Sequence, residues 1–387
     1  MRVTTIAIGA RTRRIWRICG LWAIWAALGV LGSPAGQVPR AYAQAPAEHP
    51  GDPPPGAPAA GAKPTKVEYS DHAMGTNVNV WLWTADEAGA AQAAAAVFAE
   101  MRRLDREMTN WAPKPGEPPS EVWQINDAAG GKPVKVSDET YAVIERALDI
   151  SKRSKGLFDI TVGAFRGLWK FDDDMDGTLP APADVKKRLA LVNWKDVILD
   201  AKKHTVLLRR KGMSITLGGI AKGYAVDKCV EILHKLGFKD FMMQAGGDMY
   251  IAGKKGDAPW TVAIRDPRGP NYFAVAPIEN HSFSTSGDYE RGFVAKDGVR
   301  YHHILDTRTG QPAHASRSVT IRAKDAFTAD AWSKVMFIMG SKDALALIKR
   351  EQLADFEVVW VDAKNQIVMT NGIKSVLTVL TQPTPGT

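Results

Sequence analysis

The order of the expected strands and helices constrains the fold of this chain more than any other feature. Apolar residues that alternate with polar ones predict strands, and apolar residues that recur at helical spacing predict helices. Strands are expected at 78–82, 196–199, 205–208, 241–244, 249–252, 261–264, 273–276, 318–322, 356–361 and 366–369. Helices are expected at 86–108, 137–154 (with Ser137 as N-cap), 218–236, 328–339 and 342–350. Because strands cluster and helices cluster without strict alternation, the sequence predicts an α+β fold rather than a doubly wound parallel sheet.

Residues 1–43 have the layout of a secretory signal peptide. They carry six arginines and no acidic residue, and the apolar stretch from Ile18 to Leu31 is short for a membrane span. Ala41-Tyr42-Ala43 fits a cleavage site, and an uncleaved membrane anchor is the alternative. The run Thr12-Arg13-Arg14-Ile15-Trp16 resembles a twin-arginine export motif. The sequence therefore predicts export and leaves both the general (Sec) route and the twin-arginine route open.

The rest of the chain is nearly neutral and organised as a linker followed by one domain. The net charge is +8, and the six signal arginines leave only about +2 for the remainder, so we expect no nucleic-acid partner. Residues 44–64 are rich in Pro, Ala and Gly and predict a disordered linker. A folded domain is expected at 65–380. Cys229 is the only cysteine outside the signal, and its apolar neighbours predict a buried, unreactive thiol.

The segment 301–310 carries the clearest signs of chemistry. Its sequence predicts a strand that brings His302, His303 and Asp306 to a turn closed by Gly310. Successive side chains on a strand point to opposite sides, so we expect only one of the two histidines to face a site. A neutral imidazole can take a proton from a hydroxyl group, which suits group transfer. A surface pair of histidines on an edge strand is the alternative.

Asp330 and Lys334 lie four residues apart on an expected helix. One interpretation is an ion pair on the helix surface, which is worth about 0.2–0.5 kcal/mol. The other is a carboxylate held near the helix start to bind Mg²⁺, which prefers oxygen ligands.

Two further features have both a binding and a structural interpretation. Gly218–Gly223 opens a helix, whose N-terminus attracts anions, and glycines for tight strand-to-helix packing are the alternative. The segment matches neither a Walker loop nor a dinucleotide fingerprint. Trp111, Trp169 and Trp260 are candidates for stacking on a flat ring system, and burial in the core is the alternative for each.

Seven ordered motifs across residues 67–350 resemble the ApbE family of flavin transferases, the FAD:protein FMN transferases. They are Met74-Gly75-Thr76, Phe158–Gly163, Leu217–Asp227, Ala245-Gly246-Gly247-Asp248, Ser286-Gly287-Asp288-Tyr289, His303–Gly310 and Ala329-Asp330-Ala331. The order and identities of these residues carry the resemblance.

The resemblance implies an α+β, two-lobed domain that binds FAD with Mg²⁺. It implies transfer of the FMN half of FAD to a Thr or Ser hydroxyl of an acceptor flavoprotein, with release of AMP. The protein would be periplasmic, and free or peripheral to the inner membrane. His303 would be the catalytic base. The FAD-binding residues would be Met74, Trp111, Leu157, Phe158, Asp159, Thr216, Lys222 and Leu305. The metal-binding residues would be Gly219, Asp330, Ser333 and Lys334.

The chain departs from the family pattern at three of these positions. Thr216 stands where the family usually has Asp, and Ser333 where some members carry a further Asp. Lys334 replaces a Thr oxygen ligand with a cation, so it would either exclude Mg²⁺ or contact the diphosphate in place of the ion. Two other functions stay open for this reason. One is a non-catalytic FAD-binding maturation protein for an exported redox enzyme, and the other is an FAD pyrophosphatase.

Overall fold

A computed structural model describes residues 62–172 and 174–386. The expected signal peptide at 1–43, with Cys19, and all but the last residues of the linker at 44–64 lie outside the described residues. Within the described part of the chain, no helix is both long enough and apolar enough to cross a membrane.

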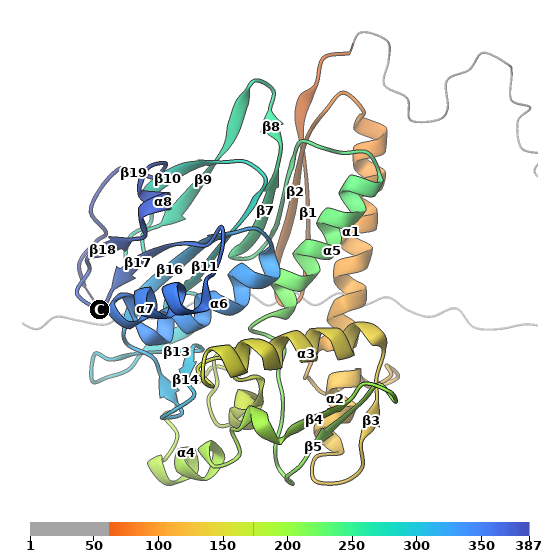
Figure 1. Ribbon diagram of the computed structural model, residues 1–387, viewed down its shortest axis with the longest axis vertical. Helices are drawn as coiled ribbons and strands as arrows, with labels where there is room; N and C mark the ends of the chain where they lie inside the picture. Colours follow the sequence, from red (N-terminus) through yellow and green to blue (C-terminus); the bar gives the residue numbers. More distant parts are fainter. Residues whose placement is uncertain (1–61, 173, 387) are drawn as a thin grey trace, which may run out of the picture. The chain divides into compact units, whose positions relative to one another are not determined.

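An eight-stranded sheet forms the centre of the fold (Figure 1). Every neighbouring pair of its strands is antiparallel, which confirms the α+β class. In spatial order the strands are β1 (Thr65–Ala73), β2 (Thr76–Thr84), β6 (Phe241–Ala245), β7 (Asp248–Ala252), β11 (His281–Gly287), β16 (Ser316–Ala323), β17 (Glu357–Asp362) and β18 (Ile367–Met369).

Helices cover one face of this sheet. They are α1 (Glu87–Met108), α5 (Ala221–Lys235) and α6 (Ala326–Met339), and α7 (Ser341–Glu351) packs beside α6. Figure 1 shows α1 and α5 running side by side next to β1 and β2. On β2, Val78, Val80 and Leu82 are fully buried, as the alternation in the sequence predicts. Their burial against the helices fixes the register of the strand.

A smaller sheet packs on the main sheet through a second apolar core. It contains β8 (Lys254–Lys255), β9 (Ala258–Arg265), β10 (Tyr272–Ile278) and β19 (Thr378–Val379). Ile251 belongs to this core, whereas its neighbour Ala252 belongs to the core under the helices. Since neighbouring residues of a strand point to opposite faces, both faces of the main sheet are covered.

A third group of elements lies between α1 and α5 in sequence. It comprises α2 (Glu121–Asp127), β3 (Val134–Lys135), α3 (Asp138–Arg153), α4 (Pro182–Leu189), β4 (Val197–Asp200) and β5 (Thr205–Leu208). Short hairpins pair β12 (Gly292–Val294) with β13 (Arg300–His302) and β14 (Leu305–Asp306) with β15 (Gln311–Pro312). The C-terminal helix α8 (Asn371–Lys374) precedes β19.

Most expected elements are found, with differences at their ends. The Ser137 hydroxyl accepts a hydrogen bond from the Thr140 N–H at 3.2 Å, which confirms the predicted N-cap of α3. The helix expected from Gly218 begins only at Ala221, because the preceding glycines form a turn. The continuous strand expected around 301–306 was wrong, because His303 and Ile304 separate β13 from β14.

Candidate active site

Four charged side chains from three elements meet at the centre of the candidate site. Lys222 of α5 lies with its Nζ 2.7 Å from Asp248 Oδ2 on β7 and 3.7 Å from Asp330 Oδ2 on α6. Lys334, one turn further along α6, pairs with Asp330 Oδ1 and donates to the Asp330 carbonyl oxygen at 2.9 Å. Both carboxylates are buried. The four formal charges alternate and cancel, which is how buried charges are tolerated.

The electrostatic field within this cluster favours the charged forms of Lys222 and Asp248. Burial opposes the charge on Lys222, but the carboxylates of Asp248 and Asp330 outweigh it and raise the pKa of the ammonium. For Asp248, burial acts against ionisation, but the cations of Lys222 and Lys334 lower its pKa below the usual value. Lys222 and Asp248 therefore stay charged near neutral pH.

A glycine allows the two helices to bring these charges together. The N–H of Gly223 donates to Asp330 Oδ2 at 2.9 Å. A Cβ atom on Gly223 would lie 2.7 Å from Asp330 Cβ and inside contact distance of the Ala326 carbonyl oxygen. Gly223 thus serves close packing, but against another helix rather than the strand that the structural interpretation expects. The close partner is helix α6.

Replacing Gly223 with alanine is expected to destabilise the protein by about 1–3 kcal/mol through overpacking. The added methyl group has to displace the backbone of α6 at Ala326. Urea denaturation measures the loss of stability. Gly237→Ala would not be a matched control, because Gly237 has a φ of +88°. Gly218→Ala serves better, since the nearest atom to its added Cβ, Thr216 Oγ1, lies at 3.4 Å. Equal stability of the two variants would contradict the packing argument.

Serine hydroxyls complete the hydrogen bonding of the charged cluster. Ser284 on β11 donates to Asp248 Oδ1. Ser333 donates to the Asp330 carbonyl oxygen at 2.7 Å, and the Ser286 hydroxyl lies 2.6 Å from that of Ser333. Because the single Ser333 hydrogen is already used, Ser286 is the donor of this last bond. The sequence analysis did not single out Asp248 or the two β11 serines as site residues.

His303 lies where β13 ends, and its side chain is solvent-accessible. Its Nδ1 is 3.3 Å from the Arg291 carbonyl oxygen, and its backbone N–H donates to the same oxygen at 3.1 Å. A carbonyl oxygen can only accept, so Nδ1 carries the hydrogen and Nε2 keeps a free lone pair. This is the tautomer that a base acting through Nε2 requires.

The surroundings of His303 keep it neutral. Although its side chain is exposed, the protein packed around it makes desolvation the main cause that lowers its pKa, and the neighbouring His302, Arg291 and Lys334 act in the same direction. The influence of Lys334 links the histidine to the charged cluster. A neutral imidazole is the form that accepts a proton from a hydroxyl group.

His302 has a structural role. It is buried, and its Nε2 lies 2.8 Å from the Ala313 carbonyl oxygen. The N–H of Ile304 donates to its Nδ1 at 3.3 Å. Both ring nitrogens are thus used by the backbone. The two histidines do point to different environments, and only His303 is available for chemistry.

Arg291, which the sequence analysis missed, connects the site to the β1–β2 turn. Its Nη1 donates to Asp172 Oδ1 at 2.6 Å and its Nη2 to the Gly75 carbonyl oxygen at 3.2 Å. The adjacent Met74 has a φ of +53°, and its N–H donates to Asp105 Oδ2 at 2.9 Å. Met74 is therefore held at the edge of the region that contains His303.

Gly219, Phe158 and Lys334 lie together. A Cβ on Gly219 would lie 3.4 Å from the Phe158 ring and 4.0 Å from Lys334 Cε. Leu157 and Phe158 are both buried in the main core. Thr216 Oγ1 accepts from the Gly218 N–H at 3.2 Å and so shapes the turn before α5. These contacts place part of the expected FAD-binding set beside the charged cluster.

Other expected FAD-binding residues lie in different surroundings. Both Asp159 oxygens accept hydrogen bonds within the protein, from Thr161 and from the Trp194 N–H at 2.8 Å. Leu305 packs against the cluster of Phe165, Trp169 and Phe171. Trp111 is 46% exposed, and the Arg166 guanidinium lies 4.6 Å from its ring centre.

The remaining candidates have structural roles. Trp169 and Trp260 are buried core residues, so their structural alternative is confirmed. Cys229 is a buried free thiol, as expected. Asp306 pairs with Arg308 at 2.7 Å and accepts from its backbone N–H, which stabilises the turn before Gly310.

The side-chain oxygens of the expected metal-binding residues are already occupied. Both Asp330 carboxylate oxygens bind donors, one Lys334 and the other Gly223. The Ser333 hydroxyl is also engaged, and Lys334 offers no oxygen. Across residues 62–172 and 174–386, no group of three or more His, Cys, Asp or Glu side chains could hold a metal ion. In this arrangement the residues do not fit a magnesium ion.

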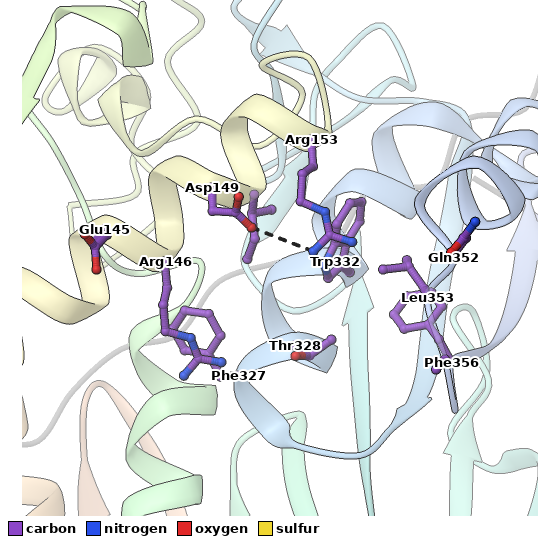
Figure 2. A pocket seen from close by; sticks show the side chains of 12 residues that line it. Glu145, Arg146, Asp149, Arg153, Phe327, Thr328, Trp332, Gln352, Leu353 and Phe356 are labelled. Carbon is purple, nitrogen blue, oxygen red and sulfur yellow. Dashed lines mark ion pairs between the residues drawn. The ribbon is translucent and has the colours of Figure 1, made fainter.

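A separate cavity of about 510 Å³ opens between α3, α6 and the segment after α7. Figure 2 shows Arg146 and Arg153 of α3 pointing toward Phe327 and Trp332 of α6. The Arg146 guanidinium lies 3.4 Å from the centre of the Phe327 ring. This cavity shares no lining residue with the charged cluster or with His303. It is therefore distinct from the candidate active site.

Comparisons with known proteins show the family of this chain. The ApbE family pattern matches residues 74–360. An FAD:protein FMN transferase of Klebsiella pneumoniae (strain 342) is 30% identical over 78% of this chain and 91% of its own length. Another, of Treponema pallidum (strain Nichols), is 37% identical over 59% of this chain and 68% of its own length. The crystal structure of the ApbE protein from Thermotoga maritima matches with a TM-score of 0.73 and 34% identity, over 81% of this chain and 99% of that one. This chain therefore belongs to the ApbE family, the family of these FAD:protein FMN transferases.

Proposed function

We propose that this protein transfers the FMN half of FAD to a Thr or Ser hydroxyl of an exported flavoprotein and releases AMP. The observation that carries the proposal is His303, a solvent-accessible neutral imidazole whose Nδ1 is fixed by the Arg291 carbonyl. It stands close enough to the Lys334 ammonium for that charge to lower its pKa. A base beside a cation is what transfer from a diphosphate needs.

The proposed reaction is a single displacement at phosphorus. The acceptor hydroxyl oxygen forms a bond to the phosphorus of the FMN half, and the bond from that phosphorus to the bridging oxygen breaks. AMP leaves with the bridging oxygen. Nε2 of His303 takes the hydroxyl proton, which makes the oxygen a better nucleophile. A positioned base of this kind typically contributes about 10²–10⁴-fold to the rate.

The proposal assigns FAD contacts to residues near the base and the cluster. Phe158 and the Gly218–Gly219 turn flank Lys334, and Met74 is held near Arg291. Leu157, Asp159 and Lys222 support these elements from buried or ion-paired positions. Thr216, Leu305 and the exposed Trp111 complete the set. The two-lobed organisation of the domain is part of the same proposal.

We place the protein in the periplasm, with the segment 1–43 as a signal peptide. The support is its basic start, its short apolar stretch and its Ala41-Tyr42-Ala43 site. The acceptor would then be an exported or membrane-bound flavoprotein, and the enzyme would be free or peripheral to the inner membrane.

The direct test uses the protein without residues 1–43, FAD and a candidate acceptor that carries a Thr in an exported segment. We expect an acceptor mass increase of one FMN group and an equal amount of AMP. Free FMN and AMP without acceptor would indicate a pyrophosphatase instead. Tight FAD binding with no AMP under any condition would indicate a non-catalytic maturation protein.

The rate of transfer is expected to stay constant at acidic pH. A histidine with the usual pKa of about 6.5 would lose roughly three quarters of its neutral form at pH 6. Desolvation and the charges of Arg291 and Lys334 lower the pKa of His303, so it stays neutral there. We therefore expect kcat/KM to change less than about twofold between pH 8 and pH 6. A half-maximal rate near pH 6.5 would contradict this expectation.

A further inference from the structure

We infer that the Lys334 ammonium takes the place of a divalent cation at the FAD diphosphate, so that this protein binds and uses FAD without a metal ion. The inference rests on the proposed function for the identity of the ligand. Lys334 is a position where this chain departs from its family. The binding of FAD, which does not require turnover, is one of the measurements that test the inference.

Both carboxylate oxygens of Asp330 already have hydrogen-bond partners. This residue is fully buried, and its Oδ1 is paired with Lys334. Its Oδ2 accepts from the Gly223 N–H at 2.9 Å and lies 3.7 Å from Lys222 Nζ. A metal ion at Asp330 would have to displace an ammonium from the same carboxylate. Mg²⁺ also loses its waters reluctantly and demands near-octahedral oxygen ligands, which a lysine cannot supply.

Lys334 keeps one hydrogen-bond donor that Asp330 does not use. An ammonium has three N–H donors. Two of them are directed to Asp330, one to the carboxylate and one to the carbonyl oxygen. The side chain is 17% exposed, so the third donor can reach a ligand. The ion pair thus fixes the ammonium in place while leaving it one hydrogen bond to give.

Lys334 lies beside the glycine turn before α5, and its charge acts on His303. Lys334 Cε lies beside Gly219, at the turn that leads into the N-terminus of α5. On its other side its charge lowers the pKa of His303. A diphosphate placed between this turn and the base would contact the ammonium. Lysine binds phosphate as a compact point charge, which is the role that a metal ion would otherwise fill.

The balance of charges in the cluster also disfavours a metal ion. Asp248 and Asp330 are balanced by Lys222 and Lys334, and Arg291 adds a positive charge that acts on both Lys222 and His303. Since Arg291 is itself paired with Asp172 at 2.6 Å, the positive and negative charges of the site balance without a metal ion. A divalent cation added here would find no carboxylate of the cluster left to balance its charge.

The test measures FAD binding and FMN transfer with an excess of EDTA and with added Mg²⁺. For the native protein we expect the Kd for FAD and the transfer rate to agree within about twofold between the two conditions. Mn²⁺ alone, followed by its EPR signal, should show no tight binding. For Lys334→Thr in EDTA we expect the Kd for FAD to rise about tenfold or more, because a charge-assisted hydrogen bond is lost.

Two further variants keep the test decisive. Lys228→Thr removes a lysine of α5 that pairs with Glu231 at 2.9 Å and lies outside the cluster, so it should behave as native. Lys334→Arg keeps the cation and should keep EDTA-insensitive binding, even if Lys334→Thr fails to fold. If EDTA weakens FAD binding or stops transfer in the native protein and Mg²⁺ restores it, the inference is overturned while the proposed function stands. If FAD binding is EDTA-insensitive and depends on Lys334 but no acceptor is modified, the proposed function fails and the inference stands.

Discussion

Replacing His303 with alanine is expected to lower the rate of FMN transfer about a hundredfold or more, with little change in FAD affinity. The imidazole is the one group at this position whose free Nε2 can accept the hydroxyl proton, since Nδ1 is held by the Arg291 carbonyl. Its removal takes away the base and leaves the charged cluster intact. Single-turnover transfer, followed by acceptor mass and AMP release, measures the loss, and flavin fluorescence measures FAD binding.

The matched control is His281→Ala. His281 also has its Nδ1 near a carbonyl oxygen, that of Glu279 at 2.8 Å, but it lies at the far end of β11 from the site serines. It should transfer FMN at the native rate. Partial recovery of His303→Ala by added imidazole would support the role of a base. A His303→Ala rate within about threefold of native would remove this residue from the mechanism.

Replacing Asp330 with alanine is expected to destabilise the fold by about 3–5 kcal/mol. Asp330 is fully buried and is the partner shared by Lys222, Lys334 and the Gly223 N–H. Without it, the Lys334 ammonium loses its paired carboxylate, Lys222 keeps only Asp248, and a buried N–H loses its acceptor. Urea denaturation at pH 7, with the slope checked against the native protein, gives the change in the free energy of unfolding.

A small set of variants separates charge from packing in this result. Asp330→Asn keeps an acceptor for Gly223 but loses the negative charge, so it should fall between native and Asp330→Ala. The double variant Asp330→Ala/Lys334→Ala removes one unpaired cation and should regain part of the loss. Asp343→Ala changes an exposed carboxylate in the first turn of α7 and should leave stability unchanged within about 0.5 kcal/mol. A loss below about 1 kcal/mol for Asp330→Ala would show that the cluster is not a stabilising feature.

The sequence analysis predicts elements best where one face is apolar and the other polar. The pattern of β2 and the Ser137 cap of α3 give correct elements from local information alone. It predicts no strand at β11, whose sequence His281–Gly287 contains three serines and a threonine. This strand is central, and its hydroxyls are satisfied by partners from other strands and from α6, such as Asp248 and Ser333. Those partners are distant in sequence, so no local pattern reveals them.

Local sequence patterns also predicted only part of the candidate site. The alternation of side chains indicated that only one of His302 and His303 could face a site, but not which one. In the folded protein His302 Nε2 donates to the Ala313 carbonyl oxygen and His302 Nδ1 accepts from the Ile304 N–H, whereas Nε2 of His303 is free, and this decides it. The Asp330–Lys334 pair followed from helical spacing. Its coupling to Lys222 and Asp248 did not, because α5 and β7 contribute these residues from elsewhere in the chain.

The sequence by itself determined the α+β class, the helices and strands with a clear apolar face, the family, and the list of residues able to do the chemistry. The tertiary structure alone decided which of them meet. It decided that Gly223 lets α5 approach α6, that Lys334 occupies the oxygens of Asp330, and that Arg291 orients the base. The physical reason is that periodicity and capping act over a few neighbouring residues, whereas charge pairing and close packing depend on which distant segments fold against each other.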